Sequence, residues 1–258
     1  MINKDRYVLV LGSKPNSQLP NIKVEKIYSA NGSAERALEY KKKYPGTFHI
    51  ALTAAAEFNE NKDVSSRIIT SNPDRLLVRM GKIPVSKELK KINKIIFMSN
   101  KEQSDFQSKF YKYGRLDLYF GEIFYYENTF WKILNHLQMC LRFRGFLGAS
   151  TGFFSILLAI KENPQCKVIV SGIGLNEGGH FYTSKDSYGY VSKNMSKLIE
   201  SKNIKLVNKF RNTSRSRVER FLINRIKKQY KSKIVSTDDE FVKNANVPKW
   251  IGEVFSNE

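Results

Sequence analysis

Cysteine and histidine are scarce in this chain, whose 258 residues include two cysteines and three histidines. The cysteines, Cys140 and Cys166, stand in separate apolar segments, and the spacing of four metal ligands is absent. Isolated thiols in apolar surroundings are typical of buried free cysteines in a reducing compartment. The sequence therefore argues against a disulfide framework and against a metal site.

Long hydrophobic runs are also missing. No stretch of about 18 apolar residues occurs, and residues 1–6 lead into the first apolar segment without the hydrophobic region of a secretory signal. We therefore expect a cytoplasmic protein without a membrane span. The length suits one large α/β domain with a proper core rather than two full domains and a linker.

Acidic residues are few, because 24 Asp and Glu stand against 44 Lys and Arg, which gives a formal net charge of +20. The excess is largest in residues 209–233, where Glu219 is the single acidic residue. A charge of this size favours an anionic partner. The composition leaves open whether that partner is nucleic acid, acidic lipid head groups or a negatively charged glycan.

The same basic segment contains apolar residues at helical spacing, namely Val218, Phe221, Leu222 and Ile226. This spacing predicts an amphipathic helix over residues 214–230. The apolar stripe of such a helix commonly packs on the protein's own core. The alternative is an anionic membrane surface, where each Lys or Arg contributes about 1 kcal/mol to binding.

Short apolar segments bounded by Gly, Pro, Asn or Ser alternate with helical patterns along the chain. The expected strands are residues 7–11, 26–29, 47–52, 94–98, 167–170 and 204–207. The expected helices are residues 34–43, 129–143, 152–162 and 192–202. Residues 55–93 give no clear pattern. The alternation predicts an α/β fold with a Rossmann-like, doubly wound and mostly parallel sheet.

We expect residues 1–208 to form this α/β domain and residues 209–258 to form a basic helical extension packed on it. Ligands of such sheets bind beyond the carboxyl ends of the strands. The polar residues and glycines expected at that edge are Gly12, Asn31, Ser99, Ser171 and Gly172.

The loop after the first strand reads Gly12-Ser13-Lys14-Pro15-Asn16. It lacks the three glycines of a dinucleotide fingerprint and the Gly-Lys-Ser/Thr of a P-loop. A short Gly-Ser loop can still direct backbone N–H groups at one phosphate, although a tight turn leaving the strand explains the same residues. Lys14 is a candidate phosphate partner or a surface lysine, and we favour the surface lysine.

A second turn, Gly148-Ala149-Ser150-Thr151-Gly152, precedes an apolar helical segment. Either Ser150 or Thr151 can cap the helix, and Gly152 lets a ligand approach the backbone. The unpaired N–H groups and the positive end of the helix dipole would then face an anion. For the turn by itself, a purely structural helix start is the favoured interpretation.

With its neighbours, this turn resembles the nucleotide site of sialyltransferases of glycosyltransferase families 29 and 42. Those enzymes have a Ser/Thr-Gly turn before a helix, then a strand ending in a Gly-containing loop, here Ser171-Gly172, and then a segment such as His180-Phe181-Tyr182. Residues 7–15 are similar to their first strand and Gly-x-x-Pro loop, and Asn31 follows a second strand as their ligand-binding Asn does. Residues 95–100 with Gln103 resemble a family 42 strand and its Ser-Asn loop.

The resemblance implies a GT-A-like sialyltransferase variant of the fold, with a mobile lid at residues 174–190. It implies transfer of a nonulosonic acid, sialic acid or a Kdo-like sugar, from its CMP conjugate to a hydroxyl of a glycan or lipid-linked saccharide. A single phosphate needs no metal, and no Asp-x-Asp motif stands at a strand end, so we expect direct displacement without a metal or other cofactor and interpret Asp238-Asp239-Glu240 as a helix cap. The nucleotide-binding residues implied are Gly12, Ser13, Asn31, Ser150, Thr151, Gly152, Ser171 and Gly172.

The resemblance also assigns catalytic roles. Tyr182 matches a family 42 tyrosine that contacts the leaving phosphate, whereas Asn176 stands where that family has another tyrosine. Both families place their base, a histidine, after the lid, but no histidine follows His180 here. We rank His180 first and Asp186 second as the general base, because an aspartate with its ordinary pKa is the weaker base at neutral pH. His49 and His136 are expected to serve packing.

A different class of function remains open. A noncatalytic α/β protein that binds a nucleotide or a nucleic acid would use the basic C-terminal segment for its main contacts. The aromatic residues of that segment form no recognisable stacking motif, so we favour the transferase over nucleic-acid binding. A lipid-linked acceptor would place the transferase peripherally on the inner membrane face through residues 209–233.

Overall fold

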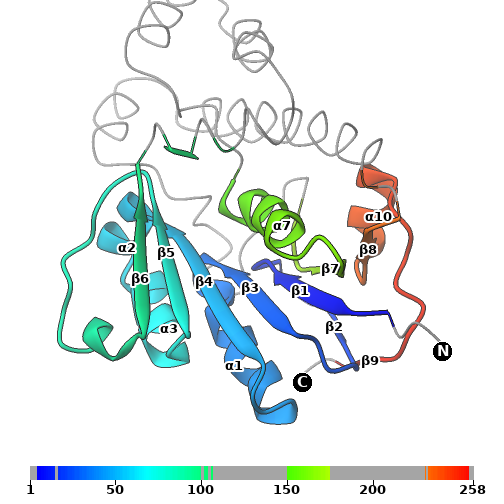
Figure 1. The fold of residues 1–258 in the computed structure, drawn as a ribbon, viewed down its shortest axis with the longest axis horizontal. Helices are drawn as coiled ribbons and strands as arrows, with labels where there is room; N and C mark the ends of the chain where they lie inside the picture. Colours follow the sequence, from blue (N-terminus) through cyan, green and yellow to red (C-terminus); the bar gives the residue numbers. More distant parts are fainter. Residues whose placement is uncertain are drawn as a thin grey trace, which may run out of the picture.

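The computed structural model describes residues 5–14, 17–99, 102, 103, 106, 150–174, 230 and 232–255. A sheet of seven strands forms its centre, and each pair of neighbouring strands in this sheet is parallel. The strand order is β6-β5-β4-β3-β1-β7-β8 (Figure 1). The bounds are β1 Tyr7–Leu11, β3 Lys26–Ala30, β4 Phe48–Ala54, β5 Arg75–Arg79, β6 Lys94–Met98, β7 Lys167–Ser171 and β8 Ile234–Ser236.

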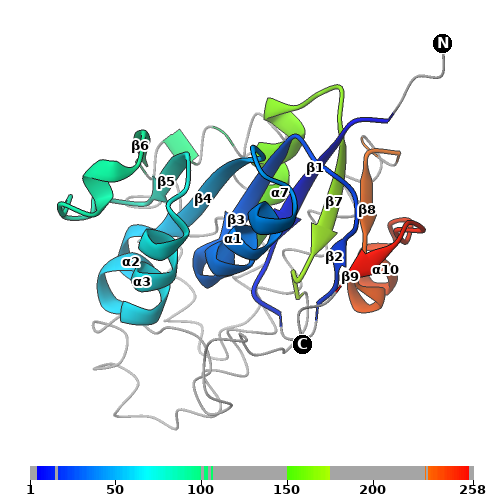
Figure 2. The same cartoon turned by 90° about the horizontal axis from the view of Figure 1, so that it is seen from below.

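Helices cover both faces of the sheet. Figures 1 and 2 show α1, α2 and α3 on one face and α7 on the other. The remaining strands, β2 Leu19–Pro20 and β9 Val254–Phe255, pair antiparallel beside the main sheet. The helical bounds are η1 Asn31–Ser33, α1 Ala34–Lys43, α2 Ala55–Glu60, α3 Lys62–Ser71, η2 Leu89–Lys91, α7 Thr151–Glu162 and α10 Asp239–Ala245.

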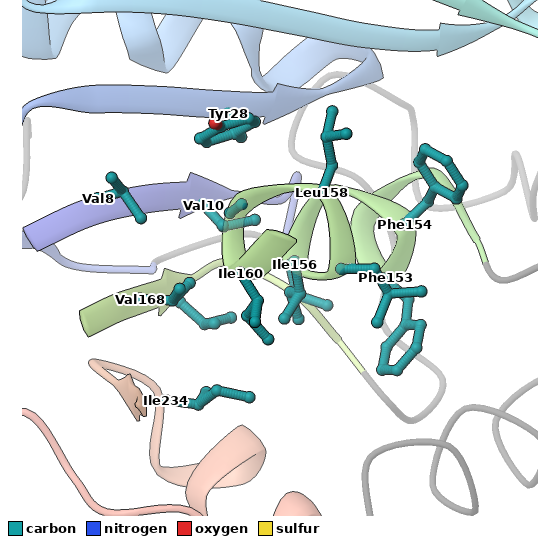
Figure 3. Close-up of a cluster of buried hydrophobic side chains, with 14 of the residues drawn as sticks. Val8, Val10, Tyr28, Phe153, Phe154, Ile156, Leu158, Ile160, Val168 and Ile234 are labelled. Atoms are coloured by element: carbon teal, nitrogen blue, oxygen red, sulfur yellow. The ribbon is translucent and has the colours of Figure 1, made fainter. Parts of the chain in front are cut away.

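The alternation of side chains along β1 divides the core between the two faces. Val8 and Val10 belong to the cluster under α7, whereas Leu9 and Leu11 belong to the cluster under α1. Figure 3 shows Val8, Val10 and Tyr28 on the strands beside the apolar side chains of α7. Every residue of α7 from Phe153 to Ile160 is buried, so this helix lies within the core. It ends at Glu162, with Asn163 as its C-cap, because the ring of Pro164 disfavours a helical conformation at Asn163.

A network of hydrogen bonds and an ion pair joins the carboxyl end of α7 to the sheet. The buried Tyr28 hydroxyl donates to Glu162 Oε2 at 2.8 Å and accepts from Asn163 Nδ2 at 2.7 Å. The Arg75 guanidinium donates to the same Glu162 oxygen at 2.5 Å. Burial and the neighbouring Glu162 carboxylate raise the pKa of Tyr28, so the hydroxyl remains a donor at all moderate pH values. The network fixes how far α7 extends along the sheet and thereby where its amino end lies.

Most of the expected elements in the described residues are confirmed. β1, β6 and α1 have the predicted bounds, β3 and β7 each extend one residue further, β4 runs from Phe48 to Ala54, and α7 begins one residue earlier, at Thr151. Residues 55–93, which gave no pattern, contain α2, α3, β5 and η2. The expected elements at 129–143, 192–202 and 204–207 lie outside the described residues.

The C-terminal part differs from the expected helical extension. Residues 234–236 are a strand of the main sheet, and residues 254–255 pair with β2, so the described part of 209–258 is not purely helical. The β-branched pair Ile234 and Val235 suits a strand beside β7. The predicted helix at 214–230 lies outside the described residues apart from Tyr230.

The structure bears on two further expectations. Cys166 is a buried free thiol, as expected, and Cys140 lies outside the described residues. Within the described ranges, the longest apolar helix falls short of what a membrane span requires.

Candidate functional site

The carboxyl ends of β1 and β7 bring two predicted glycines side by side. Leu11 pairs with Ser171 in the parallel register, so the residues that follow, Gly12 and Gly172, are neighbours. After β1 the chain forms β3, the neighbour of β1 on one side within the sheet, and later it returns to form β7, the neighbour of β1 on the other side. This reversal makes the β1/β7 edge the topological switch point, where ligands of open α/β sheets commonly bind.

The two loops pack so closely that both positions require glycine. A Cβ atom on Gly12 would lie 2.1 Å from the carbonyl oxygen of Gly172, and one on Gly172 would lie 2.6 Å from the carbonyl oxygen of Gly12. Gly172 also has a φ of +74°, in the left-handed region. Two backbone hydrogen bonds of 2.8 Å join the loops, from Gly12 N to Ser171 O and from Lys14 N to Gly172 O.

The amino end of α7 lies against the same loops. The Ser150 hydroxyl accepts from the N–H of Phe153 at 3.1 Å, which identifies Ser150 as the cap of this helix. A Cβ on Gly152 would lie 3.4 Å from Ile173 Cδ1, so the first turn of the helix touches the residue after Gly172. The N–H groups of Thr151 and Gly152 have no acceptor among the described residues. Two unoccupied donors and the positive end of the helix dipole therefore meet at the switch point.

Asn31 occupies the adjacent strand end. It has a φ of +53°, and its side-chain Oδ1 is buried without a hydrogen-bond partner in the part of the chain that the structure describes. The Ser33 hydroxyl ties this turn to β1, because it accepts from Ala30 N–H at 2.8 Å and lies 2.8 Å from Leu11 O. An unsatisfied buried acceptor costs free energy unless a donor reaches it, so Asn31 can receive a hydrogen bond from a ligand.

Other predicted site residues form the frame of the loops. The Ser171 hydroxyl is fully buried and donates to Gln18 O at 2.6 Å, and Thr237 Oγ1 donates to the same carbonyl oxygen at 2.9 Å. Ser13 is buried between Gly12 and Lys14. Direct contact of Gly12, Ser13, Ser171 or Gly172 with a ligand stays a prediction; the N–H group of Gly12 and the Ser171 hydroxyl are already engaged within the protein.

A cluster of four charged residues lies behind the loops. Lys14 forms an ion pair with Glu240 of α10, so it is partly buried rather than the surface lysine that we favoured. The Arg36 guanidinium donates to the hydroxyl and the carbonyl oxygen of Ser17, and burial lowers its pKa. Burial raises the pKa of Asp238, while the Gly172 N–H, Lys14 and Arg36 oppose that change. Two cations and two acids balance one another, so the site's attraction for an anion would come from the helix end.

The interpretation of Asp238 as a helix cap needs correction. Asp238 stands at the N-cap position of α10, but its side chain makes no hydrogen bond to that helix. Its Oδ2 instead accepts from the N–H of Gly172 at 2.5 Å. A carboxylate preceding a helix is typical of a cap, and the sequence holds no signal for a partner 66 residues away. Sequence reasoning therefore missed Asp238, and with it Arg36, as residues that shape the site.

Several predicted residues are not part of this assembly. Ser99 follows β6, and β3, β4 and β5 separate that strand from β1. Gln103 accepts a 2.9 Å hydrogen bond from Nε of the buried Arg79, next to Phe154 of α7. His180, Tyr182, Asp186, Asn176 and His136 lie outside the described residues, as does the predicted lid beyond Gly174. His49 is fully buried in β4, as expected of a packing residue.

Among the described residues, no group of three or more His, Cys, Asp or Glu side chains is arranged to hold a metal ion. Comparisons with protein-family models, curated proteins and solved structures find no match for this chain.

Proposed function

We propose that the protein is a CMP-sugar-dependent glycosyltransferase that moves a nonulosonic acid to a hydroxyl of a glycan or lipid-linked saccharide. One observation carries the proposal: the loops at Gly12 and Gly172 and the turn at Gly152 meet at one point of the sheet edge. These three segments, distant in sequence, are the ones in which the chain resembles sialyltransferases. Their proximity at the switch point supports the common site that the resemblance implies.

The unoccupied donors suit a nucleoside monophosphate. The N–H groups of Thr151 and Gly152 would donate to the phosphate that bridges cytidine and sugar, and the helix dipole would stabilise its charge as the sugar leaves. Asn31 Oδ1 would accept from a hydroxyl or amino group of the nucleoside, which would satisfy this buried acceptor. Donors fixed by the fold do not reorganise during the reaction, so they can stabilise the departing CMP without a metal.

The remaining roles fall to residues outside the described part of the chain. Tyr182 would donate to the leaving phosphate, and His180 or Asp186 would take the proton of the acceptor hydroxyl. We expect loss of the true base to reduce the transfer rate about 100-fold or more. Transfer assays with His180→Ala and Asp186→Ala identify it; wild-type rates in both variants would remove both residues from the mechanism. Residues 209–233 remain the proposed membrane contact for a lipid-linked acceptor.

Thr151 offers a sharp test of the helix end. A proline at the first position of a helix keeps the fold and removes one N–H group, and Ser150 before it already has an extended ψ of 162°. We therefore expect Thr151→Pro to weaken CMP binding about tenfold or more, the loss of one hydrogen bond to a charged group. Isothermal titration calorimetry measures the change.

Thr151→Val is the matched control, because it removes the hydroxyl and keeps the N–H group. We expect this variant to retain more CMP affinity than Thr151→Pro. Equal affinity of Thr151→Pro and wild type would contradict the proposed phosphate position. If wild-type protein ignores CMP and instead binds an oligonucleotide with strong salt dependence, the nucleic-acid alternative replaces the transferase.

A further inference from the structure

We propose that Asp238 is a positioning residue, whose carboxylate holds the Gly172 peptide in place at the switch point and thereby sets the affinity of the site for its nucleotide. The effect on nucleotide affinity rests on the proposed function, whereas the hold of Asp238 on the Gly172 peptide follows from the contacts of the loops.

The Asp238 carboxylate is hydrogen-bonded to the backbone of the loop after β7. Asp238 is 8% exposed, and its Oδ2 accepts from Gly172 N at 2.5 Å. A backbone N–H that donates to a carboxylate forms a charge-assisted hydrogen bond, about twice as strong as a bond between neutral groups. The Asp238 carbonyl oxygen accepts from Val242 N of α10, but its side chain makes no hydrogen bond to that helix, so the carboxylate serves the loop after β7.

Gly172 is held by hydrogen bonds at both its N–H group and its carbonyl oxygen. Its N–H donates to Asp238, and its carbonyl oxygen accepts from Lys14 N at 2.8 Å. The loop has little room to adjust, since a Cβ on Gly172 would lie 2.7 Å from Ser17 Oγ. Loss of the Asp238 acceptor would leave a buried N–H group without a partner, which favours rotation of this peptide toward another acceptor.

Ile173 connects the Gly172 peptide with the amino end of α7. Ile173 follows Gly172 directly and lies within van der Waals distance of the position where a Cβ on Gly152 would stand. A Cβ on Gly12 would also meet Ile173, at 2.7 Å from Cγ1. Ile173 therefore lies between the first loop and the turn that carries the proposed phosphate donors. Movement of the Gly172 peptide would change the spacing between them.

The charges around Asp238 belong to three elements. Lys14 comes from the loop after β1, Arg36 from α1 and Glu240 from α10 itself. Lys14 is engaged with Glu240 and Arg36 with Ser17. Among the described residues, the Asp238 carboxylate therefore accepts its hydrogen bond from the Gly172 N–H, while the backbone N–H of Asp238 donates to Ser236 Oγ.

The test is CMP affinity of the full chain, measured by titration calorimetry well below the melting temperature of each variant. Asp238→Ala is expected to raise the Kd for CMP about tenfold or more, because the buried Gly172 N–H loses its acceptor and the peptide can move. Asp238→Asn keeps an oxygen acceptor for Gly172 N–H, so most of the affinity should return. Wild-type affinity in Asp238→Ala would overturn the inference.

Two controls separate positioning from stability. Asp239→Ala removes the neighbouring carboxylate, which is 78% exposed and paired with Lys249, and should leave the Kd unchanged. Phe241→Leu weakens the packing of α10 and should lower the melting temperature without changing the Kd. If Phe241→Leu loses as much affinity as Asp238→Ala, the effect is one of stability and the inference fails.

Hydrogen exchange of the Gly172 amide distinguishes this inference from the proposed function. Protection in wild type and Asp238→Asn, together with its loss in Asp238→Ala, supports the role of Asp238 in holding the peptide. Equal protection in all three proteins contradicts that role. A wild-type protein that does not bind CMP would refute the proposed function, and the exchange experiment would still decide what Asp238 does.

Discussion

Replacement of Gly12 by alanine is expected to destabilise the protein by about 3 kcal/mol or more. The new methyl group would stand 2.1 Å from the carbonyl oxygen and 2.5 Å from the carbonyl carbon of Gly172, both of them backbone atoms. Side chains can rotate out of such a contact, whereas the backbone at the end of β7 is held by its hydrogen bonds to β1 and Asp238. Urea unfolding of Gly12→Ala and wild type measures the difference in the free energy of unfolding.

Gly46→Ala is the control for this prediction. Gly46 has a φ of +80°, and a Cβ there would meet no atom within 4 Å. Its replacement should therefore cost about 1 kcal/mol, the strain of a left-handed alanine. If Gly12→Ala proves as stable as Gly46→Ala, the close approach of the β1 and β7 loops is wrong, and with it the assembly of the site.

His49 is expected to make the protein sensitive to acid. The ring is fully buried in β4, and burial lowers its pKa to about 3, with Lys41 acting in the same direction and Asp74 against it. The unfolded chain has a histidine pKa of about 6.5 and so binds a proton that the folded chain rejects. The free energy of unfolding therefore falls as the pH drops from about 6.5 toward 3, by about 1.4 kcal/mol for each pH unit.

The contribution of His49 is isolated by replacing it. His49→Gln removes the titrating ring, so its free energy of unfolding should decline less steeply between pH 6.5 and pH 4 than that of wild type. Ser29→Ala removes the 2.7 Å contact between Ser29 Oγ and His49 Nε2 but keeps the ring. This control should be less stable at every pH and retain the wild-type slope. Identical slopes in wild type and His49→Gln would show that His49 does not carry the effect.

The sequence predicts those elements whose signals are local. β1 and α1 have their expected bounds because an apolar run ends at Gly12 and an amphipathic pattern ends before Pro45-Gly46. α3 escaped prediction because Ser, Thr and Ile residues with modest helix propensity fill it, and burial of Val64 and Ile68 stabilises it instead. β5 gave no clear pattern because its apolar run is only three residues long, Leu76 to Val78, between Arg75 and Arg79.

In the candidate site, too, the features with local signals are predictable from the sequence and the long-range contacts are not. Helix capping by Ser150 and the two glycine loops follow from local chemistry, and the structure brings them together as the strand pattern predicts. The hydrogen bond from Gly172 to Asp238 depends on tertiary packing between β7 and β8. Propensity and spacing hold no information on this contact. An aspartate just before a helix has the same sequence signal whether its side chain caps the helix or accepts from a distant N–H group, as Asp238 does.

The central claim is that the amino end of α7 binds the phosphate of CMP, and amide NMR of the isotopically labelled chain tests it directly. During a CMP titration, the Thr151 and Gly152 amide protons should move downfield, since each gains a charged acceptor. Cytidine lacks the phosphate and should leave both signals where they are. Saturable binding of CMP that leaves the Thr151 and Gly152 amides unchanged would contradict the account.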